Sequence, residues 1–202
     1  MDFAATSPVA LVLSLVIGYL SGSVPYGLLL TQMAGLGDVR KIGSGNIGAT
    51  NVLRTGNKGL AALTVLLDAL KGTVPVALAN HFLGLDAAIL AGLGAFLGHL
   101  YPAWLGFKGG KGVATLAGIS LGFSWHVLLP FAVVWIGMAF IFRYSSLAAL
   151  TATVVTTISL FVVGLPKLGL LYCVLTALVF FKHRQNIARL LSGEESRIGS
   201  KG

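Results

Sequence analysis

Apolar residues form long blocks along most of the chain, and polar, glycine-rich stretches separate them. A helix that crosses a bilayer needs about 20 mostly apolar residues, because the hydrocarbon core is about 30 Å thick. We therefore predict membrane-spanning helices over residues 8–31, 59–79, 86–105, 126–142, 147–164 and 168–181. The apolar run 113–123 is short for a crossing, so a half-helix, a re-entrant segment and a thinly spanning helix all stay open.

Two further features of the pattern refine this prediction. Gly-Ser-Val-Pro at residues 22–25 interrupts the first block, which predicts a kink or the close approach of another helix. Residues 182–189, after the last block, predict a short amphipathic helix at the membrane surface. The predicted fold class is all-α: a polytopic integral membrane protein of about seven transmembrane helices, with residues 1–202 forming a single membrane-embedded domain.

The composition excludes an ordinary soluble protein. Of the residues, 56% are hydrophobic and only 10% are charged, whereas soluble domains carry about 25% charged residues. The net charge is +8, and the basic residues lie between the apolar blocks. At such positions anionic lipid or a phosphorylated substrate is a better partner than nucleic acid. Cys173 is the only cysteine, so disulfides and cysteine metal sites are excluded, and we expect it to be a small buried hydrophobe.

The positions of lysine and arginine predict the orientation. Twelve of the fourteen basic residues lie in four polar segments: 35–58, 106–112, around 143, and 182–202. With seven crossings these segments share one side of the membrane, and basic loops are normally cytoplasmic. We therefore predict that the N-terminus is outside and that the C-terminus is cytoplasmic.

The first candidate site is the polar stretch after the first span. Its sequence is Gly-Ser-Gly-Asn-Ile-Gly-Ala-Thr-Asn at residues 43–51, and Arg54 follows. The three glycines permit positive φ, so that successive N–H groups can converge on an anion, and Ser44, Asn46 and Asn51 add hydrogen bonds. Arg54 supplies a permanently charged planar fork. The stretch predicts a phosphate clamp, and the alternative is a flexible polar loop.

The second candidate is a pair of charged residues inside a predicted span. Asp68 and Lys71 are three residues apart, which places them on one helix face. A charged side chain at that depth costs roughly 3 kcal/mol unless it is paired or faces water. A structural ion pair and a substrate role for Lys71 both stay open.

The third candidate lies where residues 98–112 leave the third predicted span. His99 ends an apolar helix there, and Lys108 and Lys111 flank two glycines. A nucleotide-binding P-loop would need glycine in place of Leu105 and a hydroxyl residue after Lys111, so nucleotide hydrolysis is not supported. The lysines and glycine amides suit a phosphate. His99 either contacts an anionic donor or is a satisfied structural histidine.

The remaining polar residues gather near the C-terminus. His183 and Asn186 are three residues apart and share a helical face, whereas Arg143 by itself reads as a membrane anchor. His81 and Asp86 form a literal His-x4-Asp, a pattern that many glycerophosphate acyltransferases use as base and orienter. This short pattern falls on the predicted outer face, away from the polar segments, so we reject it as a site.

Several blocks in order resemble the PlsY family of acyl-phosphate:glycerol-3-phosphate acyltransferases. After the first stretch come Lys-Gly-x-x-Pro from residue 71 and Gly-His-x-x-Pro from residue 98. They are followed by Phe-x-Gly-Gly-Lys-Gly from residue 107 and by His-Arg-x-Asn-Ile-x-Arg-Leu from residue 183. The resemblance covers residues 18–194, and no motif position departs from it.

The resemblance implies transfer of a fatty acyl group from acyl phosphate to the 1-hydroxyl of sn-glycerol 3-phosphate. The products are lysophosphatidic acid and phosphate, formed in the bacterial inner membrane with the site facing the cytoplasm. It implies no metal or other cofactor and no obligatory protein partner. We predict catalytic roles for Ser44, Asn46, Arg54, His99 and Lys111. We predict substrate or phosphate binding by Gly43, Gly45, Asn51, Lys71, Lys108, Gly109, Gly110, Ser146, His183 and Asn186.

Acyl phosphate is a mixed anhydride, so the enzyme need not supply a covalent nucleophile. It must hold two dianionic groups, align the hydroxyl with the carbonyl, and stabilise developing charge. The proton acceptor stays open among His99, His183 and a substrate phosphate, whose second pKa of about 6 is close to neutral pH. A small membrane transporter or lipid-binding protein for an anionic substrate is the alternative function.

Overall fold

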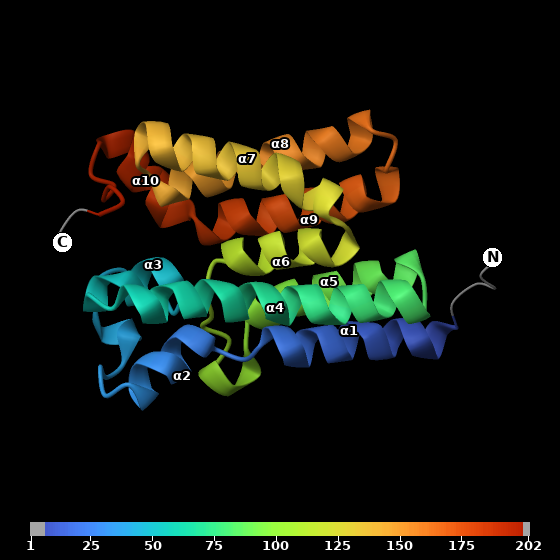
Figure 1. The fold of residues 1–202 in the computed structure, drawn as a ribbon, viewed down its shortest axis with the longest axis horizontal. Coiled ribbons are helices and arrows are strands. Elements are labelled where there is room, and N and C mark those ends of the chain that lie inside the picture. The colour runs from blue at the N-terminus through green and yellow to red at the C-terminus, as the bar shows by residue number, and fades with distance from the viewer. Residues whose placement is uncertain (1–6, 200–202) are drawn as a thin grey trace. The chain divides into compact units, whose positions relative to one another are not determined.

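The computed structural model describes residues 7–199, and all regular elements in that range are helical. It divides into two compact units, residues 1–124 and 125–202, and each is described by itself (Figure 1). Unit 1 contains α1 (Pro8–Gly22), α2 (Tyr26–Met33), η1 (Val39–Lys41), α3 (Ala49–Val52), η2 (Leu53–Thr55), α4 (Lys58–Phe82), α5 (Leu85–Leu100), η3 (Ala103–Leu105) and α6 (Val113–Phe123). Unit 2 contains α7 (Trp125–Phe142), α8 (Ser145–Val162), α9 (Pro166–Lys182) and α10 (Arg184–Ser192). The predicted all-α class is confirmed for the described residues.

The lengths of these helices fit a multi-pass membrane protein. Five segments of the described chain are long and apolar enough to cross a bilayer: Pro8–Met33, Lys58–Phe82, Leu85–Leu105, Trp125–Phe142 and Ser145–Val162. The pair α9 and α10, bent by 60°, brings the number to six when it is counted as one span. At 1.5 Å per residue, the 11 residues of α6 rise only about 16 Å.

The predicted interruption of the first block is confirmed. Helix α1 ends at Gly22 and α2 begins at Tyr26, and Pro25 has no N–H to continue the ladder. Two side chains hold the intervening backbone: Lys71 Nζ donates to the Val24 carbonyl at 2.8 Å, and Trp104 Nε1 donates to the Ser23 carbonyl at 2.7 Å. The break is therefore a fixed feature of unit 1.

Glycines permit the close packing of α1 against α5. A methyl group on Gly18 or Gly22 would collide with the carbonyl groups of Ala91 and Ala95 on α5. In the same way, a methyl group on Gly94 or Gly98 of α5 would collide with the backbone of α1. Small residues four apart are the usual device for bringing membrane helices together, because lipid supplies little hydrophobic drive for their association.

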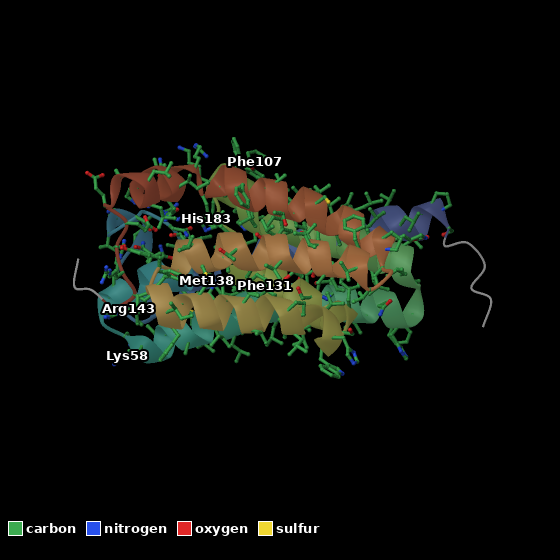
Figure 2. All side chains as sticks on the ribbon, turned by 90° about the horizontal axis from the view of Figure 1, so that it is seen from above. Lys58, Phe107, Phe131, Met138, Arg143 and His183 are labelled. Carbon is green, nitrogen blue, oxygen red and sulfur yellow. The ribbon has the colours of Figure 1, made fainter. Side chains whose placement is uncertain are left out.

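The exterior of unit 2 is largely apolar. Helix α7 buries only Val127 and Phe131, and Figure 2 shows Phe131 and Met138 along this helix, with Arg143 just beyond its end. Phe140 of the same helix is 85% exposed. A helix with so few buried residues exposes a large apolar surface, which soluble proteins rarely do. Cys173 of α9 is also exposed, so its predicted burial was wrong. An apolar position in a membrane helix can face lipid as readily as protein, and composition does not distinguish the two.

Candidate active site

The glycine-rich stretch after α2 is folded over a small apolar core. Val39, Ile47 and Val52 are buried together with Leu28 of α2 and Ala61 of α4. The stretch forms η1, α3 and η2 over this cluster, so it is an ordered segment, which argues against the flexible-loop alternative.

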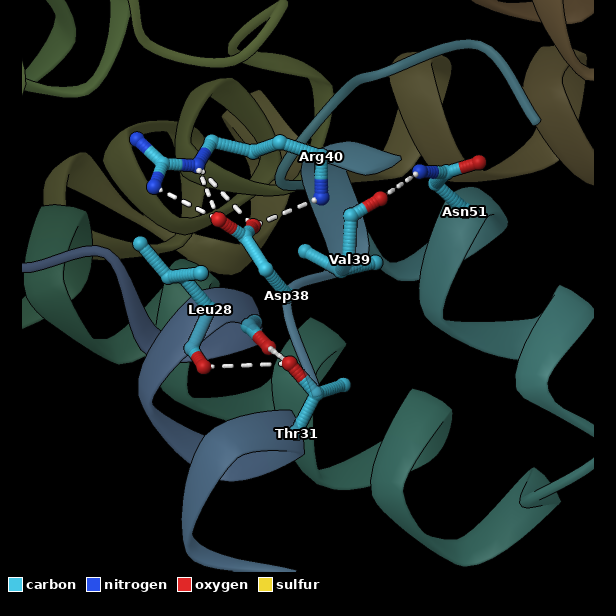
Figure 3. A network of polar contacts seen from close by, with 7 residues as sticks. Leu28, Thr31, Asp38, Val39, Arg40 and Asn51 are labelled. Atoms are coloured by element: carbon cyan, nitrogen blue, oxygen red, sulfur yellow. Dashed lines mark hydrogen bonds and ion pairs between the residues drawn. The ribbon is translucent and has the colours of Figure 1, made fainter. Parts of the chain in front are cut away.

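The Asn51 side chain holds this segment together through hydrogen bonds. Its side chain is buried, and its Nδ2 donates to the Val39 carbonyl at 2.7 Å (Figure 3) and to the Asn46 carbonyl at 2.9 Å. Its Oδ1 accepts from the Ser44 N–H at 3.2 Å and from Arg54 Nη1 at 3.4 Å. Asn51 thus sets the position of the residues around it, whatever its part in binding substrate.

Arg54 lies across the backbone of Gly43. A methyl group on Gly43 would collide with the Arg54 guanidinium and would come 2.5 Å from Asn51 Oδ1. Gly43 and Gly45 have φ of +51° and +69°, as predicted, whereas Gly48 has φ −81°, so the prediction of positive φ was wrong there. Glycine at 43 is required both by its conformation and by the space that Arg54 takes.

The backbone amides of this segment have a different role from the one predicted. The Ser44 N–H donates to Asn51, and the Gly45 N–H donates to the Ile42 carbonyl at 3.0 Å. These two amides close the loop, so they do not converge on an anion. The polar groups that suit a phosphate here are the exposed Ser44 hydroxyl and the exposed Arg54 guanidinium.

Beside this segment, Asp38 and Arg40 form an exposed ion pair that the sequence did not indicate (Figure 3). Arg40 Nη2 lies 2.7 Å from Asp38 Oδ2, and the Arg40 N–H also donates to the carboxylate. Hydrogen bonds from the Arg40 side chain, above all, lower the pKa of Asp38 to about 2. The pair closes the turn that leads into η1.

Asp68 and Lys71 form a buried ion pair, as their spacing predicted. Lys71 Nζ lies 2.6 Å from Asp68 Oδ1, and both side chains are almost fully buried. Since Lys71 also holds the break between α1 and α2 through Val24, its contacts favour the structural alternative over a substrate role. His99 Nδ1 lies 3.9 Å from the same Asp68 oxygen, which is beyond hydrogen-bond distance.

The Gly-Gly-Lys loop folds back on the end of α5. The N–H groups of Gly109 and Gly110 donate to the carbonyls of Leu100 at 3.2 Å and His99 at 3.0 Å. Gly110 also lies directly against the His99 ring, because a methyl group there would collide with Nε2. These amides again close the loop, which leaves the side chains of exposed Lys108 and half-buried Lys111 as the groups suited to an anion.

Both polar segments lie at the same end of unit 1. Leu105, which opens the loop 106–112, packs against the apolar cluster under the 43–54 segment. The His81 and Asp86 turn lies at the other end of α4, 25 residues long, and both side chains are exposed. This arrangement supports a site near Arg54 and Lys111, and it supports our rejection of the His-x4-Asp pattern.

In unit 2, Glu195 joins residues of two helices. The Ser146 hydroxyl and Asn186 Nδ2 each donate to Glu195 Oε1 at 2.6 Å, and Arg189 Nε donates to Oε2 at 2.8 Å. Burial raises the pKa of Glu195, but these hydrogen bonds outweigh burial and hold the pKa below its ordinary value. Glu195 was not among the predicted site residues.

His183 is buried at the junction of α9 and α10. Its Nδ1 lies 2.8 Å from the Val179 carbonyl. A carbonyl only accepts, so Nδ1 carries the proton and a neutral His183 has its acceptor at Nε2. Over residues 7–199, no group of His, Cys, Asp and Glu side chains comes together that could hold a metal ion.

The profile of the family described as glycerol-3-phosphate acyltransferase matches residues 12–193. The chain belongs to this family. The glycerol-3-phosphate acyltransferase of Mesorhizobium japonicum is 66% identical over 95% of this chain and 98% of its own, and that of Agrobacterium fabrum is 59% identical over 98% and 96%.

Solved structures in the same family share the fold. Crystal structures of PlsY, described as an integral membrane glycerol 3-phosphate acyltransferase, match with TM-scores of 0.89 and 0.87 at 42% and 40% identity. Each match covers 94% of this chain, with 96% and 95% of the PlsY chains. One holds the glycerol 3-phosphate form and the other the lysophosphatidic acid form. The predicted resemblance to PlsY is confirmed.

Within this acyltransferase the structure brings together some of the predicted residues and not others. Gly43, Ser44, Asn51 and Arg54 form one contacting group, and His99 with Gly110 forms another. In unit 2, Ser146 and Asn186 meet only through a residue that sequence reasoning missed. The signal for Glu195 was weak: it is one of six acidic residues in a basic chain, and it follows α10.

Proposed function

We propose that this glycerol-3-phosphate acyltransferase takes its acyl group from acyl phosphate. It transfers that group to the 1-hydroxyl of sn-glycerol 3-phosphate, in the first committed step of bacterial phospholipid synthesis. The bond between the acyl carbonyl and the phosphate oxygen breaks, an ester to glycerol forms, and the hydroxyl proton leaves with lysophosphatidic acid and inorganic phosphate as products. Membership of the family supports the acyltransferase activity, and the likeness to PlsY in its glycerol 3-phosphate form supports the acceptor.

One observation carries the proposal for the site. Arg54 is held across Gly43 and Asn51 at the same end of unit 1 as the loop that carries Lys111. A planar fork and a compact ammonium group fixed near a membrane surface suit the phosphates of two dianionic substrates. Ser44, Asn46 and Lys108 are proposed to assist there, and His99 to lie beside the reacting groups.

No covalent nucleophile is needed, because the mixed anhydride is already electrophilic. The enzyme accelerates the reaction by positioning both substrates and by stabilising the oxyanion and phosphate charge that develop. The hydroxyl proton passes to His99, to His183 or to a substrate phosphate. The acyl chain lies among apolar helices, which accounts for a site in a membrane protein.

For the membrane arrangement, we propose seven crossings that include α6 and α9. The whole chain then acts as one embedded catalytic domain in the bacterial inner membrane, with the N-terminus outside and the C-terminus and site on the cytoplasmic side. The location of twelve of fourteen basic residues in the polar segments supports this orientation.

The test is an assay of purified protein with glycerol 3-phosphate and either acyl phosphate or acyl-CoA. We expect lysophosphatidate with acyl phosphate only. Lysophosphatidate with acyl-CoA alone would overturn the donor assignment, and no product from either donor would favour a transporter or lipid-binding protein.

Two variants test the site in the same assay. Lys111→Ala is expected to abolish turnover while the protein still inserts into the membrane, because an essential phosphate contact is lost. His81→Ala is the matched control and should keep nearly full activity. Equal activity of the two variants contradicts the assignment.

A further inference from the structure

Phe107 has a backbone conformation that suits glycine better than phenylalanine. Its φ is +62°, directly after Gly106 at +58°. A bulky residue rarely occupies this left-handed region, because its Cβ crowds the neighbouring backbone, whereas glycine enters it freely. Strained residues persist where the surrounding structure fixes them, and they gather at places that bind ligands. The phenylalanine ring is thus held at a position where the backbone disfavours any side chain.

Hydrogen bonds on both sides fix this conformation. The Phe107 N–H donates to the Pro102 carbonyl at 3.0 Å, and the Lys108 N–H donates to the Leu105 carbonyl at 3.2 Å. The next two N–H groups close the loop on the end of α5. The backbone contacts of the loop do not involve the ring, so a substitution at residue 107 can remove the ring and leave them in place.

Packing within unit 1 does not account for the ring. The glycines of the same loop face the protein: a methyl group on Gly110 would collide with the His99 ring, and one on Gly112 would collide with the Phe96 ring. Phe107, by contrast, is 62% exposed. An exposed phenylalanine in a strained conformation contributes little to the core, which points to a contact outside the chain.

The surroundings of the ring indicate the chemistry of that contact. The apolar segment Leu85–Leu105 ends two residues before Phe107, Lys108 follows directly, and Lys111 lies in the same loop. A phenyl ring at the end of a membrane span meets acyl chains, and a lysine ammonium group meets phosphate. A molecule whose apolar chain begins close to its phosphate satisfies both groups at once.

We propose that Phe107 contacts the first methylenes of the acyl chain of acyl phosphate, while Lys108 and Lys111 face its phosphate. Phe107 is then a specificity-determining residue for the acyl donor. This inference rests on the proposed function. Glycerol 3-phosphate has no apolar group for the ring, and inorganic phosphate has the anionic head of the donor without its chain, so the ring favours the donor over both.

Two substitutions of Phe107 separate the ring from the backbone strain. Phe107→Ala removes the ring and keeps the strain, whereas Phe107→Gly removes both and should melt no lower than Phe107→Ala. In a fixed detergent, KM for palmitoyl phosphate should rise about tenfold in each variant, since each loses the same partly buried apolar contact. KM for glycerol 3-phosphate should stay within about twofold.

Phe82→Ala is the matched control. Phe82 is 68% exposed and ends α4, so the same atoms are removed from a similarly exposed phenylalanine elsewhere in unit 1. All kinetic constants of this variant should stay within about twofold of wild type. A rise in KM for palmitoyl phosphate equal to that of Phe107→Ala would show a general effect of exposed rings and would overturn the inference.

An amphiphile that does not react gives an independent readout. Dodecyl phosphate has a phosphate and a chain but no acyl group, whereas inorganic phosphate has no chain. Inhibition by dodecyl phosphate should weaken about tenfold in Phe107→Gly, and inhibition by inorganic phosphate should change by less than about twofold. Equal weakening of the two inhibitors would assign the effect to the phosphate, and it overturns the inference.

Other outcomes distinguish the donor from bulk lipid and the ring from the backbone. If Phe107 only anchors the loop in the bilayer, KM for palmitoyl phosphate is unchanged in detergent and activity falls only in phospholipid vesicles, which overturns the inference. A defect in Phe107→Ala that Phe107→Gly restores would assign the effect to strain and also overturns it. A wild-type protein that makes no lysophosphatidate from acyl phosphate refutes the proposed function before any variant is compared.

Discussion

Replacing Gly43 by alanine tests the geometry of the proposed phosphate clamp most directly. Gly43 has φ +51°, and a methyl group there would enter the space of the Arg54 guanidinium. It would also come 2.5 Å from Asn51 Oδ1, which accepts from Arg54 Nη1. Alanine thus strains the backbone and displaces the side chain that we assign to phosphate.

The two effects have separate magnitudes. A residue with a Cβ in the left-handed region costs roughly 1–2 kcal/mol. Moving Arg54 away from a substrate phosphate costs a charge-assisted hydrogen bond, about 1.5–3 kcal/mol, which corresponds to roughly 10-fold to 150-fold in kcat/KM. The first loss appears in stability and the second in activity.

Gly56→Ala provides the matched control. Gly56 has φ +84°, but a methyl group there would meet nothing within 4 Å. Both variants should therefore lose the conformational contribution to thermal stability in detergent, about 2–4 °C for each kcal/mol, and Gly43→Ala should lose at least as much as Gly56→Ala. Only Gly43→Ala should lose kcat/KM for glycerol 3-phosphate by the factor above. Equal kinetic constants in the two variants would refute the placement of Arg54 in the site.

The remaining predictions concern the frame around the site. Asp68→Asn leaves Lys71 buried without its carboxylate and should destabilise the protein by roughly 3–5 kcal/mol in thermal unfolding; an unchanged transition contradicts a structural pair. Gly94→Leu should lower the melting temperature sharply, because its side chain would collide with the α1 backbone at Leu15, and a wild-type melting temperature would refute the close packing. Since the folded-state pKa of Glu195 is depressed, its stabilising contact is present above pH 4.5 and is lost as pH falls through the folded value. Pepsin cleavage after α10, compared with that of Glu195→Gln at each pH, should accordingly be slower in wild type near pH 4.5 and approach the rate of the variant on acidification; a ratio that does not change with pH contradicts the contact.

The sequence predicted the helices well, because the bilayer demands long apolar runs that are visible without any tertiary information. The break at Pro25 and the short run 113–123 could also be predicted, because both interrupt or shorten an apolar run. The burial of Cys173 was not, since lipid and protein select the same apolar residues. The direction an apolar side chain faces depends on neighbouring helices, which hydropathy does not specify.

For the site, the structure bears on the backbone groups more than on the residue types. Arginine, lysine and glycine in the 43–54 and 106–112 segments predict a phosphate site, and this stays a prediction. The same glycines suggested that backbone amides bind the anion, but the N–H groups of Gly45 and Gly110 close their own loops. Positive φ permits a turn, but it does not specify the acceptor of each N–H, which is the Ile42 carbonyl for Gly45 and the His99 carbonyl for Gly110.

Glu195 escaped prediction because no local motif connects it with its partners Ser146 and Asn186, which lie 49 and 9 residues away. An acid is also unexpected in a chain whose net charge is +8. Its contacts explain its presence better than net charge does: Oε1 accepts from Ser146 of α8 and from Asn186 of α10, and Oε2 accepts from Arg189. One carboxylate thus joins two helices of unit 2, and partners this far apart in the sequence are brought together only by the fold.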